Sequence, residues 1–173
     1  EIEAEMRRHE LPYRIVRTTG VEHGCERALA AAAAGEIPVV VSGDGLIGKI
    51  GGALAGGGVP LGVIPGGRGN DLARVVGIPV EPAGAVAVLA RGERRRIDVG
   101  EANNGRFLCI ASCGFASDAN RIANEARAIR GPLVYAYAAL KALAQWRPAR
   151  FTVTVDGIEH AFTGYSVVVA NSK

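Results

Sequence analysis

The chain has 173 residues, of which 49% are hydrophobic and 24 are glycine, about twice the usual share of glycine. This length and apolar content exclude a disordered chain, and three cysteines without CxxC spacing exclude a disulfide scaffold and give no sign of a zinc site; they are typical of reduced thiols in a cytosolic protein. The net charge of +3 suits a phosphate-bearing ligand or an anionic membrane face, but is too weakly basic to indicate nucleic acid.

The first half of the chain predicts alternating helices and strands. Two short all-apolar runs, 39–41 and 61–64, are typical of strands buried on both faces of a parallel sheet. The alternation therefore predicts an open, parallel α/β sheet. In chain order, the expected elements are a helix over 1–9, a strand over 13–18, a helix over 22–34, a strand over 39–41, a helix to about 55, a strand over 61–64, and helices to 76 and over 82–91.

After residue 92 the pattern changes to the polar and apolar alternation of antiparallel strands. Turn residues at 103–105 and 156–157 predict two hairpins. We therefore expect an open parallel-sheet α/β domain over residues 1–92 and a β-rich, sandwich-like second domain over 93–173. The expected elements of the second domain are strands over 94–100, 106–113, 151–156 and 165–170, with helices over about 118–128 and 133–146.

Half of the glycines lie between Gly43 and Gly69, and the stretch 43–50, G-D-G-L-I-G-K-I, fits two common phosphate-binding patterns incompletely. The dinucleotide pattern GxGxxG lacks its ribose-binding acid, because the next strand ends in Ile64-Pro65-Gly66. The pattern GxxxxGK[ST] lacks its hydroxyl residue, because Ile50 takes that place. Neither interpretation is favoured.

A third interpretation starts from Asp44, which stands between two glycines where a buried strand ends. Ligands of open α/β sheets bind at that edge, and a carboxylate beside phosphates is useful for holding Mg²⁺ or taking a proton. The neighbouring strand is followed by a second glycine loop, Gly66-Gly67-Arg68-Gly69, and then a helix start that favours phosphate. The two loops together predict a nucleotide-dependent phosphotransferase without a Walker motif.

These residues resemble the diacylglycerol kinase catalytic domain shared by bacterial lipid kinases, sphingosine kinases and ceramide kinases. The segments 42–46, S-G-D-G-L, and 65–73, P-G-G-R-G-N-D-L-A, match the paired motifs of that family at a similar spacing. Three further segments also resemble it: Thr18 with His23, the strand Ile97–Gly100, and Gly114-Phe115 with Asp118.

The resemblance implies a kinase that transfers the γ-phosphoryl group of ATP, with Mg²⁺ bridging the phosphates, to the hydroxyl of a lipid such as diacylglycerol. It implies that Asp44 is the catalytic carboxylate and a Mg²⁺ ligand, and that Asp118 binds the polar head of the acceptor. The residues that would bind ATP and Mg²⁺ are Thr18, Gly43, Asp44, Gly45, Gly67, Gly69, Asn70 and Asp71.

Two departures from the family pattern leave other functions open. Lys49 stands where the family usually has Glu, and Arg68 where it usually has Thr or Ser. The first strand of the family and its later GGG and D-G-x-L-D segments are not in the sequence, so we expect part of a longer protein that binds nucleotide but lacks some catalytic groups. The alternatives are a kinase for a soluble substrate, similar to NAD kinase, and a non-catalytic nucleotide-binding regulatory module.

Several residues also have structural interpretations. Helix capping is a structural alternative for four of them: Asp44, Asn70, Asp71 and Asp118.

The expected location of the protein is the cytoplasm, with peripheral contact at the inner membrane face. An arginine cluster at 91 and 94–96 is either solvated charge or a rim that meets anionic headgroups. Tyr135, Tyr137 and Trp146 either pack a helix or border a lipid-binding surface, and the acceptor lipid and oligomeric state are not predicted.

Overall fold

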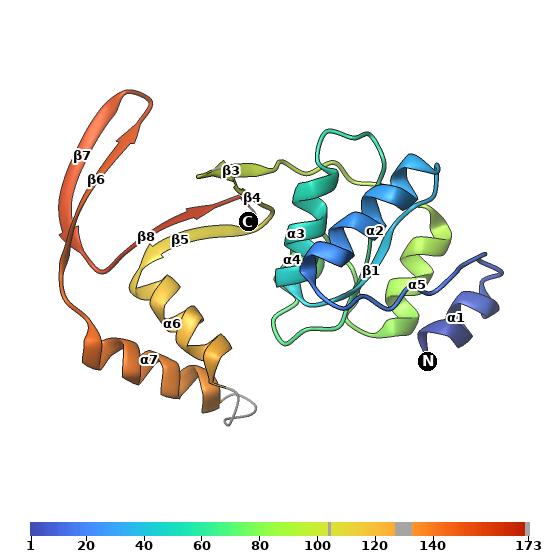
Figure 1. Ribbon diagram of the computed structural model, residues 1–173, viewed down its shortest axis with the longest axis horizontal. Helices are drawn as coiled ribbons and strands as arrows, with labels where there is room; N and C mark the ends of the chain where they lie inside the picture. The colour runs from blue at the N-terminus through green and yellow to red at the C-terminus, as the bar shows by residue number, and fades with distance from the viewer. Residues whose placement is uncertain (104, 127–132, 172–173) are drawn as a thin grey trace. The chain divides into compact units, whose positions relative to one another are not determined.

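The computed structural model describes residues 1–103, 105–126 and 133–171 of the chain (Figure 1). These residues form two compact units, one made of residues 1–109 with the C-terminal residues from Ala170, and the other of residues 110–169. The domain boundary expected near residue 92 stays a prediction, and by their contacts residues 93–109 lie with the first unit. Asn104 of the first expected hairpin and residues 127 and 128 of an expected helix lie outside the described residues.

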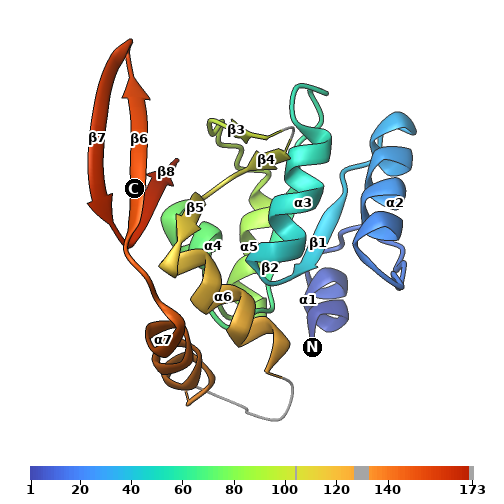
Figure 2. The same cartoon turned by 60° about the vertical axis from the view of Figure 1, so that its left-hand side comes forward.

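The first unit is built around two parallel strands, β1 (Val39–Ser42) and β2 (Gly62–Pro65), as the apolar runs predicted. Side chains alternate along β2, so Val63 packs against one group of helices and Ile64 against another. One apolar core therefore lies on each face of β2. Figure 2 shows the helices that surround the two strands. The helices on the first face are α2 (Val21–Ala33) and α3 (Asp44–Leu54), and those on the second are α1 (Ile2–Arg8) and α5 (Pro82–Arg91).

Strand β1 differs from the expectation of burial on both faces. Val40 is buried in the core with α2 and α3, whereas Val39 and Val41 on the opposite face are 38% and 52% exposed. The described residues 13–18 also form no strand, because no other described segment pairs with them through backbone hydrogen bonds. An extended segment is part of a sheet only when such bonds form a ladder.

A hairpin of β3 (Gly100–Ala102) and β4 (Gly105–Phe107) packs on α3. Gly51 and Gly52 of α3 permit this packing, because a Cβ on Gly51 would lie 2.6 Å from Leu108 Cδ1 and one on Gly52 3.0 Å from Arg106 Cβ. Of the strand expected over 94–100, only Gly100 lies in a strand, β3. The strand expected over 106–113 is divided, because Leu108 turns into the core between β4 and the next strand.

The second unit contains β5 (Ile110–Gly114), α6 (Phe115–Glu125), α7 (Leu133–Gln145) and the antiparallel hairpin of β6 (Ala149–Val155) and β7 (Ile158–Gly164). β8 (Ser166–Ala170) pairs with β5. The β6–β7 turn was expected at 156–157 and has the left-handed backbone that such turns require, with φ of 51° at Asp156 and 83° at Gly157. No helix among the described residues is long and apolar enough to cross a bilayer.

Candidate phosphate-binding site

The two glycine loops lie side by side, because the strands that precede them are parallel and in register. Ser42, the last residue of β1, is paired with Pro65, the last residue of β2. The ladder continues one step beyond the strands, since the N–H of Gly66 donates to the carbonyl oxygen of Ser42 at 2.8 Å. Both loops therefore leave the same edge of the sheet, where open α/β folds bind ligands.

The backbones of Gly43 and Gly67 lie in direct contact. A Cβ on Gly43 would lie 3.0 Å from the Cα of Gly67, and a Cβ on Gly67 would overlap the Cα of Gly43. These two glycines are thus required by the approach of the loops to each other. Gly45 is different, because a Cβ there would meet no atom within 4 Å. The space beside Gly45 is open to a ligand.

Asp44 is the first residue of α3, yet its side chain does not cap that helix. Its Oδ1 accepts a hydrogen bond of 3.1 Å from the N–H of Leu72, in the first turn of α4 (Asp71–Val75). Its Oδ2 and both carboxylate oxygens of Asp71 lie 3.3–3.4 Å from the point where a Cβ on Gly69 would stand. Two carboxylates from different loops therefore lie close together beside Gly69.

Asn70 fixes the shape of the second loop. Its side chain is buried, with 4% of the residue exposed, and its backbone is left-handed with φ of 55°. The Oδ1 atom accepts from the N–H of Gly67 at 2.8 Å, and the Nδ2 donates to the carbonyl of Gly67 at 3.1 Å. Arg74 adds a bond of 3.0 Å from its Nε to the carbonyl of Gly69. Asn70 thus acts on the loop itself and has both of its polar atoms occupied.

These bonds determine which backbone N–H groups are available to an anion. The N–H groups of Gly66 and Gly67 both donate inside the protein. In the part of the chain that the structure describes, no acceptor is recorded for those of Arg68 and Gly69. The first turn of α3 also has no side-chain cap. Free N–H groups at a helix start and in an adjacent glycine loop are suited to phosphate oxygens.

The two carboxylates fit a magnesium ion that is shared with phosphates. Among the described residues, no group of three or more His, Cys, Asp or Glu side chains is placed to hold a metal. Mg²⁺ does not need such a group, since it commonly binds one or two carboxylates together with substrate phosphates and waters. Asp44 and Asp71 provide such a pair, and Asp44 retains Oδ2 for this purpose while Oδ1 holds Leu72.

Two other expected site residues belong to other segments of the chain. Thr18 is exposed in the segment before α2, and the adjacent Thr19 is held by His23, whose Nδ1 lies 3.3 Å from the Thr19 nitrogen. Asp118 belongs to the second unit, where it lies in the first turn of α6 and pairs with Arg121 at 3.5 Å. It is not the N-cap of that helix, which is Gly114.

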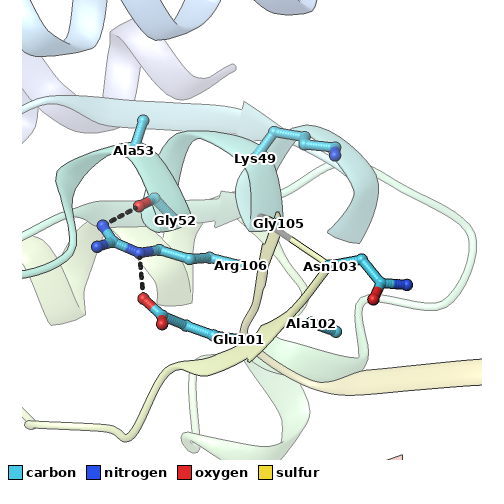
Figure 3. A pocket seen from close by; sticks show the side chains of 8 residues that line it. All are labelled: Lys49, Gly52, Ala53, Glu101, Ala102, Asn103, Gly105 and Arg106. Carbon is cyan, nitrogen blue, oxygen red and sulfur yellow. Dashed lines mark hydrogen bonds and ion pairs between the residues drawn. The ribbon is translucent and has the colours of Figure 1, made fainter.

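A separate cavity of about 630 Å³ lies between α3 and the β3–β4 hairpin (Figure 3). Arg106, which the sequence analysis did not identify, donates from Nη1 to the carbonyls of Gly52 and Ala55 at 3.1 and 3.2 Å and pairs with Glu101. It thereby caps the last turn of α3. The Lys49 ammonium points away from this guanidinium in Figure 3, so the two cations do not converge on one ligand. The lining residues are Lys49, Gly52, Ala53, Glu101, Ala102, Asn103, Gly105 and Arg106.

Comparison with known proteins agrees with the fold and the paired loops. Residues 1–102 match the family described as "Diacylglycerol kinase catalytic domain", and residues 109–173 match the "YegS C-terminal NAD kinase beta sandwich-like domain". A "Diacylglycerol kinase" of Mycobacterium tuberculosis is 37% identical over 148 residues, which are 81% of this chain and 48% of that protein. A "Probable lipid kinase YegS-like" of Pseudomonas aeruginosa is 40% identical over 106 residues, which are 59% of this chain and 35% of that protein.

A crystal structure of a diacylglycerol kinase from Bacillus anthracis str. Sterne aligns with a TM-score of 0.71 and 22% identity over 97% of this chain and 56% of that one. This likeness shows that the fold is shared. The α/β unit with paired glycine loops, followed by a β-rich unit, is that of a lipid-kinase catalytic region. The chain belongs to the diacylglycerol kinase catalytic domain family, and it spans about a third to a half of the length of the curated relatives it matches.

Proposed function

We propose that this chain is the ATP-binding part of an Mg²⁺-dependent lipid kinase that transfers the γ-phosphoryl group of ATP to a lipid hydroxyl. One observation carries the proposal: Asp44 and Asp71, from loops that follow two adjacent parallel strands, bring their carboxylates close together beside Gly69, and the space at Gly45 is open. Family membership supports the kinase class, and the names of the relatives favour diacylglycerol or a similar acceptor.

Each loop would contribute a different part of the chemistry. The uncapped first turn of α3 and the free N–H groups of Arg68 and Gly69 would bind phosphate oxygens and stabilise charge on the transferring group. Asp44 and Asp71 would hold Mg²⁺, which supplies neutralisation of phosphate charge when bound. Asp44 would also orient the acceptor hydroxyl and take its proton. Most of the rate in such reactions comes from positioning and electrostatic stabilisation.

The other expected ligands remain part of the proposal in narrower roles. Thr18 would contact the nucleotide and Asp118 the acceptor head. Gly43, Gly67 and Asn70 would act through the shape of the loops, because their backbone contacts and hydrogen bonds lie within the protein. Exposed Lys49 and Arg68 would add positive charge that favours ATP binding.

The structure offers a matched pair of variants for Asp44. In Asp44→Asn a carbonyl oxygen remains to accept the bond from Leu72, while the negative charge is removed. Asp44→Ala removes the bond as well, which costs about 1 kcal/mol of stability by analogy with helix caps. We expect Asp44→Asn to melt like the wild type, and both variants to lose phosphoryl transfer.

Transfer is measured as radiolabel moving from ATP to diacylglycerol, other lipids or NAD, in the longest polypeptide that contains this chain. Labelling of a lipid by wild type and not by Asp44→Asn supports the proposal. Full lipid labelling by Asp44→Asn would refute the role of Asp44, and labelling of NAD alone would refute the lipid acceptor. Nucleotide binding without transfer to any acceptor would favour a regulatory module.

A further inference from the structure

The second glycine loop, residues 66–69, is fixed at separate points along its backbone. Its first half is held by Asn70, whose side chain bonds to both polar groups of the Gly67 backbone. In the described part of the chain, its second half has one recorded hydrogen bond, from Arg74 Nε to the carbonyl oxygen of Gly69 at 3.0 Å. Glycine backbone adopts many conformations, so this single bond determines how the second half lies.

Arg74 makes this bond in place of a common helical ion pair. It stands three positions after Asp71 on α4, a spacing at which arginine and aspartate side chains can pair. Among the described residues, no ion pair of Arg74 with an acid is recorded, and its guanidinium turns back to the loop. The Asp71 carboxylate beside Gly69 is thereby left for the Mg²⁺ of the proposed function.

The bond to Arg74 also sets the direction of the next N–H group in the loop. The peptide bond between Gly69 and Asn70 is trans, so its C=O and N–H point in opposite directions. Because the Gly69 carbonyl points to Arg74, the Asn70 N–H points away from that side chain. Within the described ranges this N–H has no recorded acceptor, although Asn70 is 4% exposed. Buried N–H groups are nearly always paired, so we expect its acceptor to come from a ligand.

Rotation of the same peptide group would reverse this arrangement. The carbonyl oxygen of Gly69 would then take the place of the Asn70 N–H and would repel phosphate oxygens, since a carbonyl only accepts hydrogen bonds. The observed orientation requires φ of 55° at Asn70, which is uncommon for a residue with a side chain and persists only where the surroundings hold it. The bond from Arg74 is one of the contacts that hold it.

We propose that Arg74 is a positioning residue for phosphate binding, which holds the Gly69 carbonyl away from the phosphates so that the N–H groups of residues 68–70 face them. The inference rests on the proposed function, because it requires the nucleotide to bind at these loops. Arg74 acts through its Nε hydrogen bond and not through its charge. It therefore affects ATP binding without touching the nucleotide.

Two neutral variants separate the hydrogen bond from the charge. In Arg74→Gln the side-chain amide nitrogen stands as many bonds from the backbone as Nε of arginine, so it can donate to the Gly69 carbonyl. In Arg74→Met a methyl group takes that position and cannot donate. The control is Arg91→Met, which removes the same charge from the last turn of α5. That turn lies at the other end of β2 from the loops, because Leu89 lies close to Gly62, where β2 begins.

Calorimetric titration of the chain with ATP and Mg²⁺ measures the effect on binding. Arg74→Met should bind ATP about tenfold more weakly than the wild type, because the loop must then be ordered when the nucleotide binds. Arg74→Gln and Arg91→Met should bind within about threefold of the wild type. The bond is exposed, so all three variants should melt close to the wild type.

NMR of the nucleotide-free chain measures the effect on the loop itself. Arg74→Met should move the amide signals of Gly69 and Asn70, whereas Arg74→Gln should leave them near their wild-type positions. Equal loss of ATP affinity in both Arg74 variants would show that the charge acts, and would overturn the proposal. So would wild-type ATP affinity in Arg74→Met, or unmoved amide signals. Wild type that binds no ATP would instead refute the proposed function, and this inference with it.

Discussion

Replacing Gly67 by Ala tests whether the two loops are held by direct backbone contact. The new Cβ would overlap the Cα of Gly43 and lie 3.1 Å from Oδ1 of Asn70. The obstacle on one side is backbone at the end of a paired strand, which cannot rotate away as a side chain can. The cost should therefore resemble that of overpacking a core, about 1–3 kcal/mol of unfolding free energy.

The matched control is Gly48→Ala, inside α3, where a Cβ would meet no atom within 4 Å. This variant should gain about 0.5–1 kcal/mol, since Ala is the better helix former. Urea denaturation with an unchanged m-value measures both effects. The reasoning would be refuted if Gly67→Ala were as stable as the wild type, or if the two variants lost equal stability.

Two further predictions concern contacts away from the loops. Arg106→Ala should lower the unfolding free energy by about 1–2 kcal/mol, because the carbonyls of Gly52 and Ala55 lose their charged donor. Arg106→Lys should restore only part of this loss. Denaturation curves of the wild type and the two variants measure both effects, and an unchanged curve for Arg106→Ala would contradict the prediction. The Arg14 guanidinium, hydrogen-bonded to Glu36, lowers the pKa of that carboxyl, so their ion pair stabilises the fold above the ordinary pKa of Glu36 and is lost as the pH falls through the lowered value. Arg14→Gln should raise the pKa of Glu36 towards its ordinary value in an NMR titration, and an unchanged titration would contradict the pairing.

Much of the first unit was predictable because its signals are local. The apolar runs gave β1 and β2, and the glycines after them gave the loops at the same edge of the sheet. The burial of β1 was not predictable in the same way, because a run of valines does not indicate which elements will pack on each face of the strand. Val39 and Val41 are only partly covered by the described residues, whereas Val40 is buried.

Within the site, sequence reasoning identified Asp44 but not its partner. Asp44 was expected either to cap its own helix or to bind a ligand, and the structure gives it a third contact, the N–H of Leu72 in α4. That bond joins residues 28 positions apart, so no local pattern signals it. Arg106 was missed for the same reason, since the carbonyls it caps lie more than 50 positions earlier in the chain.

The central claim is that the paired loops bind ATP with Mg²⁺ in the open space beside Gly45. Calorimetric titration of the chain with ATP, in Mg²⁺ and in chelator, tests it directly. We predict binding that weakens in chelator and falls by at least about tenfold in Gly45→Ala, with Gly48→Ala binding as the wild type does and both variants melting no lower than it. Equal ATP affinity for wild type and Gly45→Ala, unaffected by removal of Mg²⁺, would contradict the account.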